Sequence, residues 1–408
     1  MSFETLTVLF AAIVLAQVWW SHRLLSRAAA AGQRPKRLSH YPAVSVIRPI
    51  KGLDSQARQN LEAALDSGYP GPVETIFVFD GPNEPAYPLA LEVVERHRES
   101  GRPGTAKVIF CGEPPEGRTG KLNAMIAGLS QARGELIAFA DSDTRPGRES
   151  LARLVEMLLS SPKAGSAFAP VVVTTPPKTV GDAGYALLLN GLYGSVAALT
   201  AARNNGELSF IMGQFMVLKR ESLAAIGGLE SATGQFVDDM YLGARIRAAG
   251  LSNLVSPGAV PIIQEGLSFG EFWRIYVRWI AFSRSGLPDW SFKLPAIAHG
   301  VILWLGVVGL LAGGILGFWL PAACAAPIIL AVSASINNLH RAHGGSPLKI
   351  RHWWVSSLLL LMAPLVFANV YWRREVEWRG RSYKLDHESR LAEDDPADKH
   401  GGSRVETA

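Results

Sequence analysis

Residues 135–143 have the sequence ELIAFADSD, a short apolar run that ends in two acidic residues. An apolar run of this length without a helical period predicts a buried β-strand over Glu135–Ala140. Asp141 and Asp143 follow it directly, at the edge where open α/β sheets bind ligands. Alternate residues of an extended turn point the same way, so these carboxylates are candidate ligands for a divalent cation. An Asp-x-Asp triplet is expected about once by chance in a chain of this length, and its residues can also simply cap a helix. The prediction of a cation site therefore rests on the position of the triplet directly after the strand.

The surrounding sequence alternates short β-branched runs with helical stretches between residues 43 and 265. This alternation is typical of a mostly parallel sheet with helices on both faces, and it predicts an α/β domain. The expected strands are Val44–Arg48, Val73–Phe79, Lys107–Phe110 and Glu135–Ala140, and the expected helices run from Asp54 to Leu65, from Glu84 to Arg98, from Lys121 and from Glu149.

Acidic residues at two other places are candidates for a site. Asp80 ends the second expected strand, where its carboxylate can accept a uracil N–H, although the following Gly-Pro-Asn also makes an ordinary turn. Asp238 and Asp239 open a helix, where acidic residues commonly cap. Neighbouring carboxylates repel each other, which raises one pKa and suits a base that deprotonates a hydroxyl. One of these two aspartates could cap the helix while the other acts as the base.

Residues 117–121, with the sequence GRTGK, resemble a phosphate-binding loop. They fail as a P-loop because Pro115 stands at the first glycine position and Leu122 follows the lysine, which disfavours an ATPase. Lys121 and Asn123 at the start of the next helix remain candidates for contact with phosphate or uridine, and plain loop chemistry remains the alternative.

Composition indicates that part of the chain lies in lipid, because 48% of the residues are hydrophobic, 18% are charged and the mean hydropathy is +0.16. Residues 5–20 are uncharged and arginines follow them, which predicts an uncleaved anchor with the rest of the chain in the cytoplasm. Three apolar blocks, 296–318, 321–336 and 353–372, predict a C-terminal membrane region. The apolar stretch 185–202 is interpreted as a buried or interfacial helix.

Two further features of the sequence concern the membrane region. Three C-terminal crossings would put the basic residues after 372 on the outside, against the positive-inside tendency, so one block is expected to be re-entrant. Residues 269–284 predict an interfacial helix whose apolar stripe, formed by Phe269, Phe272, Trp273, Tyr276 and Ile280, lies among lipid headgroups. Arg274 and Arg278 share its other face, where they meet either a diphosphate or lipid phosphates.

The remaining composition excludes several classes of protein. Cys111 and Cys324 are too few for a disulfide scaffold or a four-thiolate zinc site. The formal net charge is +5, but the arginines cluster beside apolar runs, so no nucleic-acid partner is expected. Residues 386–408 are acidic and poor in apolar side chains, and we expect them to be disordered.

Together these motifs resemble the ceramide glucosyltransferase family of inverting glycosyltransferases. The similarity covers about residues 1–385, and Ile275 departs from it, since the family has Arg or Gln there; Arg274 is the nearest substitute. The matching segments are Val44–Asp54, Asn60-Leu61-Glu62, Tyr69-Pro70, Asp80, Lys121-Leu122-Asn123, Asp141-Ser142-Asp143, Asp239 and Arg278-Trp279.

The resemblance implies a Rossmann-like GT-A fold and a role for each matching residue. Asp141 and Asp143 would bind Mg²⁺ or Mn²⁺ on a UDP-sugar, and Asp239, beside Asp238, would deprotonate the primary hydroxyl of a lipid, with Arg278 and Trp279 completing the catalytic set. The donor would contact Pro49, Lys51, Asp80, Lys121, Asn123, Asp141 and Arg274.

The expected domains are an anchor with a basic flank (1–42), a GT-A domain (43–265), an interfacial helix (266–292), a transmembrane region (293–374) and a basic, then disordered tail (375–408). The chain would be an integral membrane protein with a cytoplasmic catalytic domain, at the inner membrane if bacterial. A hopanoid or other lipid as the acceptor, and a catalytically inactive scaffold of the same fold, remain open alternatives.

Overall fold

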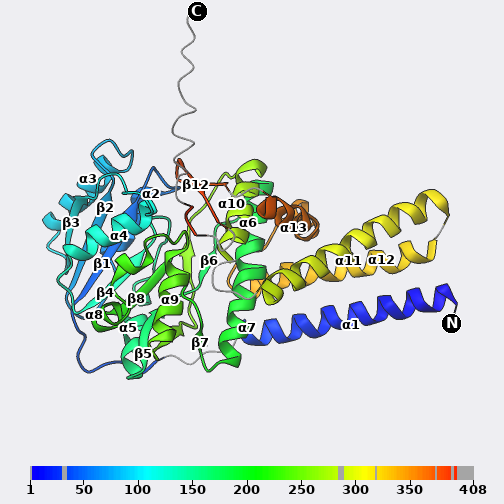
Figure 1. Cartoon of the computed structure of the whole chain (residues 1–408), viewed down its shortest axis with the longest axis horizontal. Coiled ribbons are helices and arrows are strands. Elements are labelled where there is room, and N and C mark those ends of the chain that lie inside the picture. The colour runs from blue at the N-terminus through cyan, green and yellow to red at the C-terminus, as the bar shows by residue number, and fades with distance from the viewer. Residues whose placement is uncertain are drawn as a thin grey trace, which may run out of the picture.

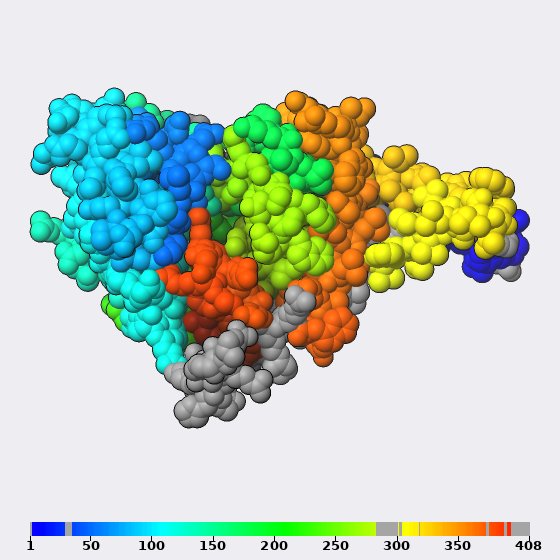
Figure 2. Space-filling model, turned by 90° about the horizontal axis from the view of Figure 1, so that it is seen from above, coloured from blue at the N-terminus to red at the C-terminus, as the bar shows by residue number. Residues whose placement is uncertain are grey.

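The computed structural model describes residues 2–29, 35–283, 289–317, 319–372, 375–386 and 390–392. An α/β body forms one part of the molecule, and long helices form an arm that extends away from it (Figure 1). The C-terminal strands return to the body and lie between it and the helices (Figure 2).

A mixed sheet of eight strands forms the centre of the body, which confirms the predicted mostly parallel sheet. The first four strands in its order, β3-β2-β1-β4, are parallel, and β8 enters antiparallel between β4 and β5. The strands are β1 (Val44–Ile50), β2 (Val73–Phe79), β3 (Thr105–Phe110), β4 (Leu136–Ala140), β5 (Ala164–Phe168), β7 (Glu207–Leu208), β8 (Phe215–Lys219) and β9 (Ser252–Val255), while β6 (Val171–Val173) and β10 (Val260–Ile262) pair separately.

Helices cover both faces of this sheet, because alternate side chains of its strands point to opposite sides. Val46 and Ile47 of β1 thus belong to different apolar cores, one closed by α5 and the other by α4 and α9. The helices of the body are α2 (Ala57–Leu65), α3 (Tyr87–Glu99), α4 (Gly120–Ser130), α5 (Ser150–Ser160), α8 (Arg220–Ala225), α9 (Asp238–Ala248) and the 3₁₀ turn η2 (Leu229–Ala232).

The remaining helices are apolar. Among the described residues, four segments are long and apolar enough to cross a membrane: Phe3–Ala28, Val180–Arg203, Trp319–Ala342 and Ile350–Trp372. The first half of Val180–Arg203 is buried in the protein, which agrees with a buried helix. The elements are α1 (Phe3–Ala29), α6 (Val180–Ala186), η1 (Leu187–Gly194), α7 (Ser195–Arg203), α10 (Phe269–Ser283), α11 (Asp289–Leu316), α12 (Trp319–Ala342), η3 (Ile350–His352) and α13 (Val355–Trp372).

Helix α10 corrects one prediction. Three residues of its apolar stripe, Phe272, Tyr276 and Ile280, are buried inside the protein rather than available to lipid headgroups. The stripe packs on α6 and α13, and a Cβ added to Gly184 of α6 would lie 2.6 Å from the Phe272 ring. This close approach lets α10 lie directly on its neighbours, so its polar face turns toward the body.

The C-terminal segment corrects a second prediction. Glu375–Trp378 and Arg381–Lys384 form an antiparallel hairpin, β11–β12, in the segment that we expected only to be a basic tail. Trp378 and Tyr383 pack against Phe236, and this aromatic contact fixes the hairpin on the body. The expectation of disorder from residue 386 is also wrong for residues 390–392, which bond to the backbone of Gly234 and Lys384. The rest of the expected disordered segment lies outside the described residues.

Candidate active site

The site begins at the carboxyl ends of three neighbouring parallel strands. Ile50 of β1 is in register with Phe79 of β2, so the next residues, Lys51 and Asp80, meet. Lys51 Nζ lies 2.6 Å from Asp80 Oδ2 and 2.6 Å from Glu84 Oε1. Asp141 follows β4 at the same edge, where ligands bind in open α/β sheets.

A buried arginine fixes the loop after β4. Arg48, on the central strand β1, is 1% exposed, and its Nη2 donates to the carbonyl oxygens of Asp141 (2.7 Å) and Thr144 (2.8 Å). Burial lowers the pKa of Arg48 to about 10, and the nearby Asp143, Asp141 and Asp54 carboxylates oppose that shift. The guanidinium is therefore charged at neutral pH, and its hydrogen bonds fix the backbone of the loop.

Three carboxylates line the cavity at this loop, one more than the sequence predicts. Asp54 accepts a hydrogen bond of 2.5 Å from Ser142 Oγ, and Asp141 Oδ1 lies 2.6 Å from Lys121 Nζ. Burial raises the pKa of Asp143 to about 7, with a further rise from Asp54 that Arg379 opposes. Asp143 Oδ1 is buried and has no hydrogen-bond partner among the described residues.

Asp238 and Asp239 lie at the start of α9, behind Lys121, and not on the cavity wall. Asp239 Oδ2 accepts the Gly213 N–H (2.6 Å) and Oδ1 accepts the Met240 N–H (2.8 Å). Burial raises the pKa of Asp239 to about 6, and repulsion from Asp238 adds to the rise. The residue that caps the helix is Val237, without a side-chain bond, so neither carboxylate is the helix cap.

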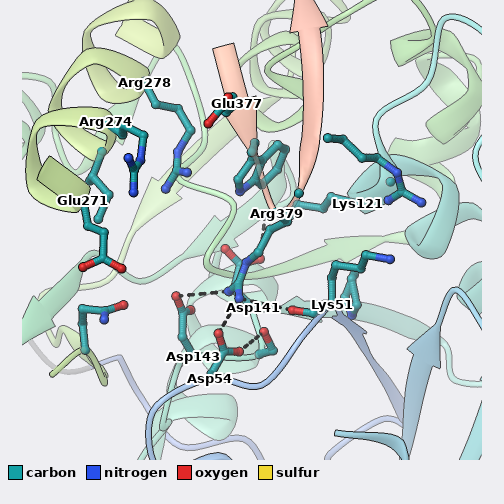
Figure 3. Close-up of a pocket in the computed structure, with 18 of the residues that line it drawn as sticks. Lys51, Asp54, Lys121, Asp141, Asp143, Glu271, Arg274, Arg278, Glu377 and Arg379 are labelled. Carbon is teal, nitrogen blue, oxygen red and sulfur yellow. Dashed lines mark hydrogen bonds and ion pairs between the residues drawn. The ribbon is translucent and has the colours of Figure 1, made fainter. Parts of the chain in front are cut away.

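The inner face of α10 forms another wall of the cavity (Figure 3). Arg274 and Arg278 project from it toward the carboxylates, as the helical spacing predicts. The Arg278 guanidinium lies 5.9 Å from the centre of the Trp378 ring, and its Nε has no hydrogen-bond partner among the described residues. Trp279 also lines the cavity and packs edge-on against Tyr193, with ring centres 5.0 Å apart.

The β11–β12 hairpin adds two basic residues that the sequence analysis missed. Arg379 Nη1 lies 2.5 Å from Asp54 Oδ1 (Figure 3), and Arg381 Nη2 lies 2.9 Å from Asp80 Oδ2. The alternation of arginine with aromatic residues around Gly380 is a signal for a hairpin, and it could have revealed this element.

Most of these groups surround one cavity of about 480 Å³, within the usual size range of small-molecule sites. Asn123 does not line it, because its amide donates to the carbonyl oxygens of Cys111 and Gly112. The predicted residues that do line it are Pro49, Lys51, Asp80, Lys121, Asp141, Asp143, Arg274, Arg278 and Trp279, and those that sequence reasoning missed include Asp54, Glu377, Arg379 and Arg381.

A sheet of this order, with charged side chains at the carboxyl ends of its parallel strands, has the GT-A fold of glycosyltransferases. A mannosyltransferase from Pyrobaculum calidifontis, PcManGT, has a similar fold, with a TM-score of 0.51, 17% sequence identity, and coverage of 91% of this chain and 99% of that one. The chain belongs to glycosyl transferase family 21, whose model matches residues 5–391. It is therefore a sugar-transferring enzyme.

Curated relatives agree with this assignment. Ceramide glucosyltransferase 3 of Caenorhabditis elegans is 23% identical over 364 residues, which are 86% of this chain and 74% of that protein. Ceramide glucosyltransferase 1 of the same organism is 24% identical over 273 residues, 65% of this chain and 56% of that protein. The similarity thus includes proteins named for transfer to a lipid.

Proposed function

We propose that this family 21 enzyme transfers one sugar from a UDP-sugar to the primary hydroxyl of a membrane lipid, with inversion at C1, and that the lipid is ceramide. The cavity is the observation that carries the proposal. Carboxylates and basic groups line it together with the aromatic side chains of Trp279, Phe282 and Trp378. The charged groups suit a diphosphate, and the aromatic side chains suit a lipid acceptor. The ceramide glucosyltransferases among the relatives support the choice of acceptor.

A divalent cation fits the carboxylates of the loop after β4. Asp141 and Asp143 offer hard oxygen ligands, and the buried Asp143 Oδ1 has no other partner among the described residues. Within the described residues, no group of three or more acidic, histidine or cysteine side chains is placed to hold a metal ion without other ligands. Mg²⁺ and Mn²⁺ commonly take one or two carboxylates and complete their coordination with phosphate oxygens, and PcManGT is described in complex with GDP-Man and Mn²⁺. When bound, the cation would neutralise the charge of the diphosphate.

The basic residues would bind the rest of the donor. Arg274 and Arg278 approach the carboxylates from α10, so a diphosphate between these arginines and the cation would meet positive charge on both sides. Asp80 would accept the uracil N–H at Oδ1, where its present contact is a weak one of 3.7 Å from the Cys111 thiol. Its other oxygen stays with Lys51 and Arg381.

The chemical step needs a base and a leaving group. Asp239 lies behind Lys121 rather than on the cavity wall, so the acceptor hydroxyl would have to reach past Lys121. Asp239 would then accept the proton of that hydroxyl as its oxygen forms a bond to C1. The bond between C1 and the phosphate oxygen breaks on the opposite face, and its electron pair leaves with UDP, so the product is a β-linked glycolipid. A pKa of about 6 leaves Asp239 ionised at neutral pH while it remains basic enough to take a proton.

Membrane attachment would bring the acceptor to this site. Large exposed apolar residues gather on α1, α11 and α12, and the basic residues Arg23 and Arg27 of α1 stand next to the catalytic body. Lipid tails would remain in the bilayer while the hydroxyl enters beside Trp279. On this proposal, the chain is an integral membrane protein with a cytoplasmic catalytic domain.

The test is a transfer assay with the full chain in nanodiscs, a panel of UDP-sugars, and ceramide as acceptor, with and without EDTA. We expect a hexosylceramide that forms only with a divalent cation, and near-complete loss of product in D143A and D239N. The matched control is D66N, because Asp66 lies on the surface in a weak pair with Arg148. Lipid extracts that contain a glycosylated hopanoid and no hexosylceramide would contradict the proposed acceptor, and full activity of D143A would contradict the proposed chemistry.

A further inference from the structure

Arg379 occupies an unusual position at the tip of the β11–β12 hairpin. The two residues that connect the strands, Arg379 and Gly380, both have positive φ angles, 51° and 75°. Such a turn favours Asn-Gly, since a longer side chain in the left-handed region costs about 1 kcal/mol. An arginine held in this conformation indicates a function for its side chain rather than for the turn.

The side chain of Arg379 reaches the centre of the site. Its Nη1 donates to Asp54 Oδ1 (2.5 Å) and to the Lys51 carbonyl oxygen (3.2 Å), and its Nη2 lies 3.8 Å from Asp143 Oδ2. The last distance is too long for a hydrogen bond, so Asp143 has an ion pair without a bond. The side chain is 36% exposed within an open cavity, so an incoming ligand can displace it.

The surrounding groups are incomplete without a further ligand. Asp143 Oδ1 and Arg278 Nε are both buried and both lack a hydrogen-bond partner among the described residues. Arg379 stands between these two sets, with the carboxylates on one side and α10 on the other (Figure 3). A cation would satisfy the carboxylate, and a phosphate would satisfy the guanidinium.

We propose that Arg379 is a donor-binding residue that exchanges partners: without donor its guanidinium neutralises Asp54 and Asp143, and with donor it binds the diphosphate. The proposal rests on the proposed function, because the incoming ligand is a cation-bound nucleotide sugar. A guanidinium binds phosphate through paired hydrogen bonds, so the exchange replaces one charge-assisted contact with another. The cation then takes the position near Asp143 that Arg379 leaves.

The exchange predicts opposite shifts in two affinities when Arg379 becomes glutamine. The donor-free protein should bind Mn²⁺ several-fold more tightly, because a competing positive charge is gone. In saturating Mn²⁺, the protein should bind UDP about tenfold more weakly, because a charge-assisted contact to phosphate is lost. A merely structural role would weaken both affinities together or leave both unchanged.

Both affinities are measured by isothermal titration calorimetry on the full chain in nanodiscs, with MnCl₂ alone and then with UDP in saturating MnCl₂. R379K, which keeps the charge without the planar fork, should keep the wild-type Mn²⁺ affinity and recover part of the UDP affinity. R102Q removes an exposed arginine from the loop before β3 and should change neither affinity.

Opposite shifts in R379Q support the exchange, and any other pair of shifts overturns it. A wild-type protein that binds no UDP in MnCl₂ refutes the proposed function as well. Wild-type binding that R379Q leaves unaltered refutes only the role of Arg379.

Discussion

Replacement of Gly213 by alanine tests whether the position of Asp239 controls catalysis. The Gly213 N–H holds Asp239 Oδ2 at 2.6 Å, and a Cβ at residue 213 would lie 2.7 Å from both Cβ and Oδ2 of Asp239. That distance is about 0.7 Å shorter than the 3.4 Å at which ordinary van der Waals contact begins. The carboxylate must therefore move by a large part of an ångström.

A displacement of about 1 Å at a reacting group can cost about 10²-fold in rate, so we expect kcat of G213A to fall by about that factor. The KM for the donor should change little, since Asp239 does not line the cavity. Overpacking should also lower the free energy of unfolding by about 1–3 kcal/mol. The assay is steady-state transfer to ceramide in nanodiscs, with the melting temperature measured on the same preparation.

G270A is the matched control, because a Cβ at this exposed glycine of α10 meets no atom within 4 Å. It should keep the wild-type kcat. The double variant G213A/D239N should be little worse than D239N, since a displaced base has little left to lose. A G213A enzyme with the wild-type kcat, or a double variant whose losses multiply, would refute the reasoning.

Four further outcomes are expected. In a kcat–pH series, activity should rise about tenfold per pH unit below pH 6 and level above it, because a raised pKa of about 6 keeps Asp239 protonated on the acid side. D238N removes a repelling charge and should move this rise to lower pH, whereas an unmoved profile would exclude the coupling. R48M deletes both bonds to the loop after β4 and should lower stability by about 2 kcal/mol, measured as a lower melting temperature; an unchanged value would show that the loop holds itself. W378A should speed hydrogen exchange in residues 375–384 and leave the central sheet unaffected, since Trp378 packs the hairpin on Phe236; uniform acceleration would point to global destabilisation instead.

The fold of the body could be predicted because its signals are local. The strand over residues 73–79 agrees with the structure at both ends, and the strand after residue 135 begins one residue later than predicted. Each of these strands is an apolar run bounded by turn residues, so period and length identify it. The carboxylates at the strand ends follow from the same pattern, since parallel strands end at one edge.

The contacts of the hairpin could not be predicted, because 325 residues separate Arg379 from Asp54. No periodicity or spacing relates positions so far apart. The sequence around Arg379 is basic and lies after apolar helices, which suggested a basic tail. Asp54 was expected at the start of a helix, and its place beside Asp143 depends on the loop that Ser142 closes.

The buried face of α10 shows a different limit. An apolar stripe requires an apolar neighbour, but it does not say whether that neighbour is lipid or protein. Gly184 decides the matter here, because the absence of its side chain admits the Phe272 ring. The arginine face could be predicted, since residues four apart on a helix share a side.

The contact between Arg379 and Asp54 also limits the number of times that the C-terminal helices can cross a membrane. Both residues must lie on one side of any bilayer, so the chain between Ser283 and Glu375 can traverse it only an even number of times. An even count allows either two of α11, α12 and α13 to span a bilayer or none of them. Helix α13 packs on α6 and α10, the helices beside the site, so we expect α11 and α12 to be the pair that spans. This parity leaves the hairpin arginines on the same face as those that follow α1, and the charge asymmetry of the loops becomes consistent from one end of the chain to the other.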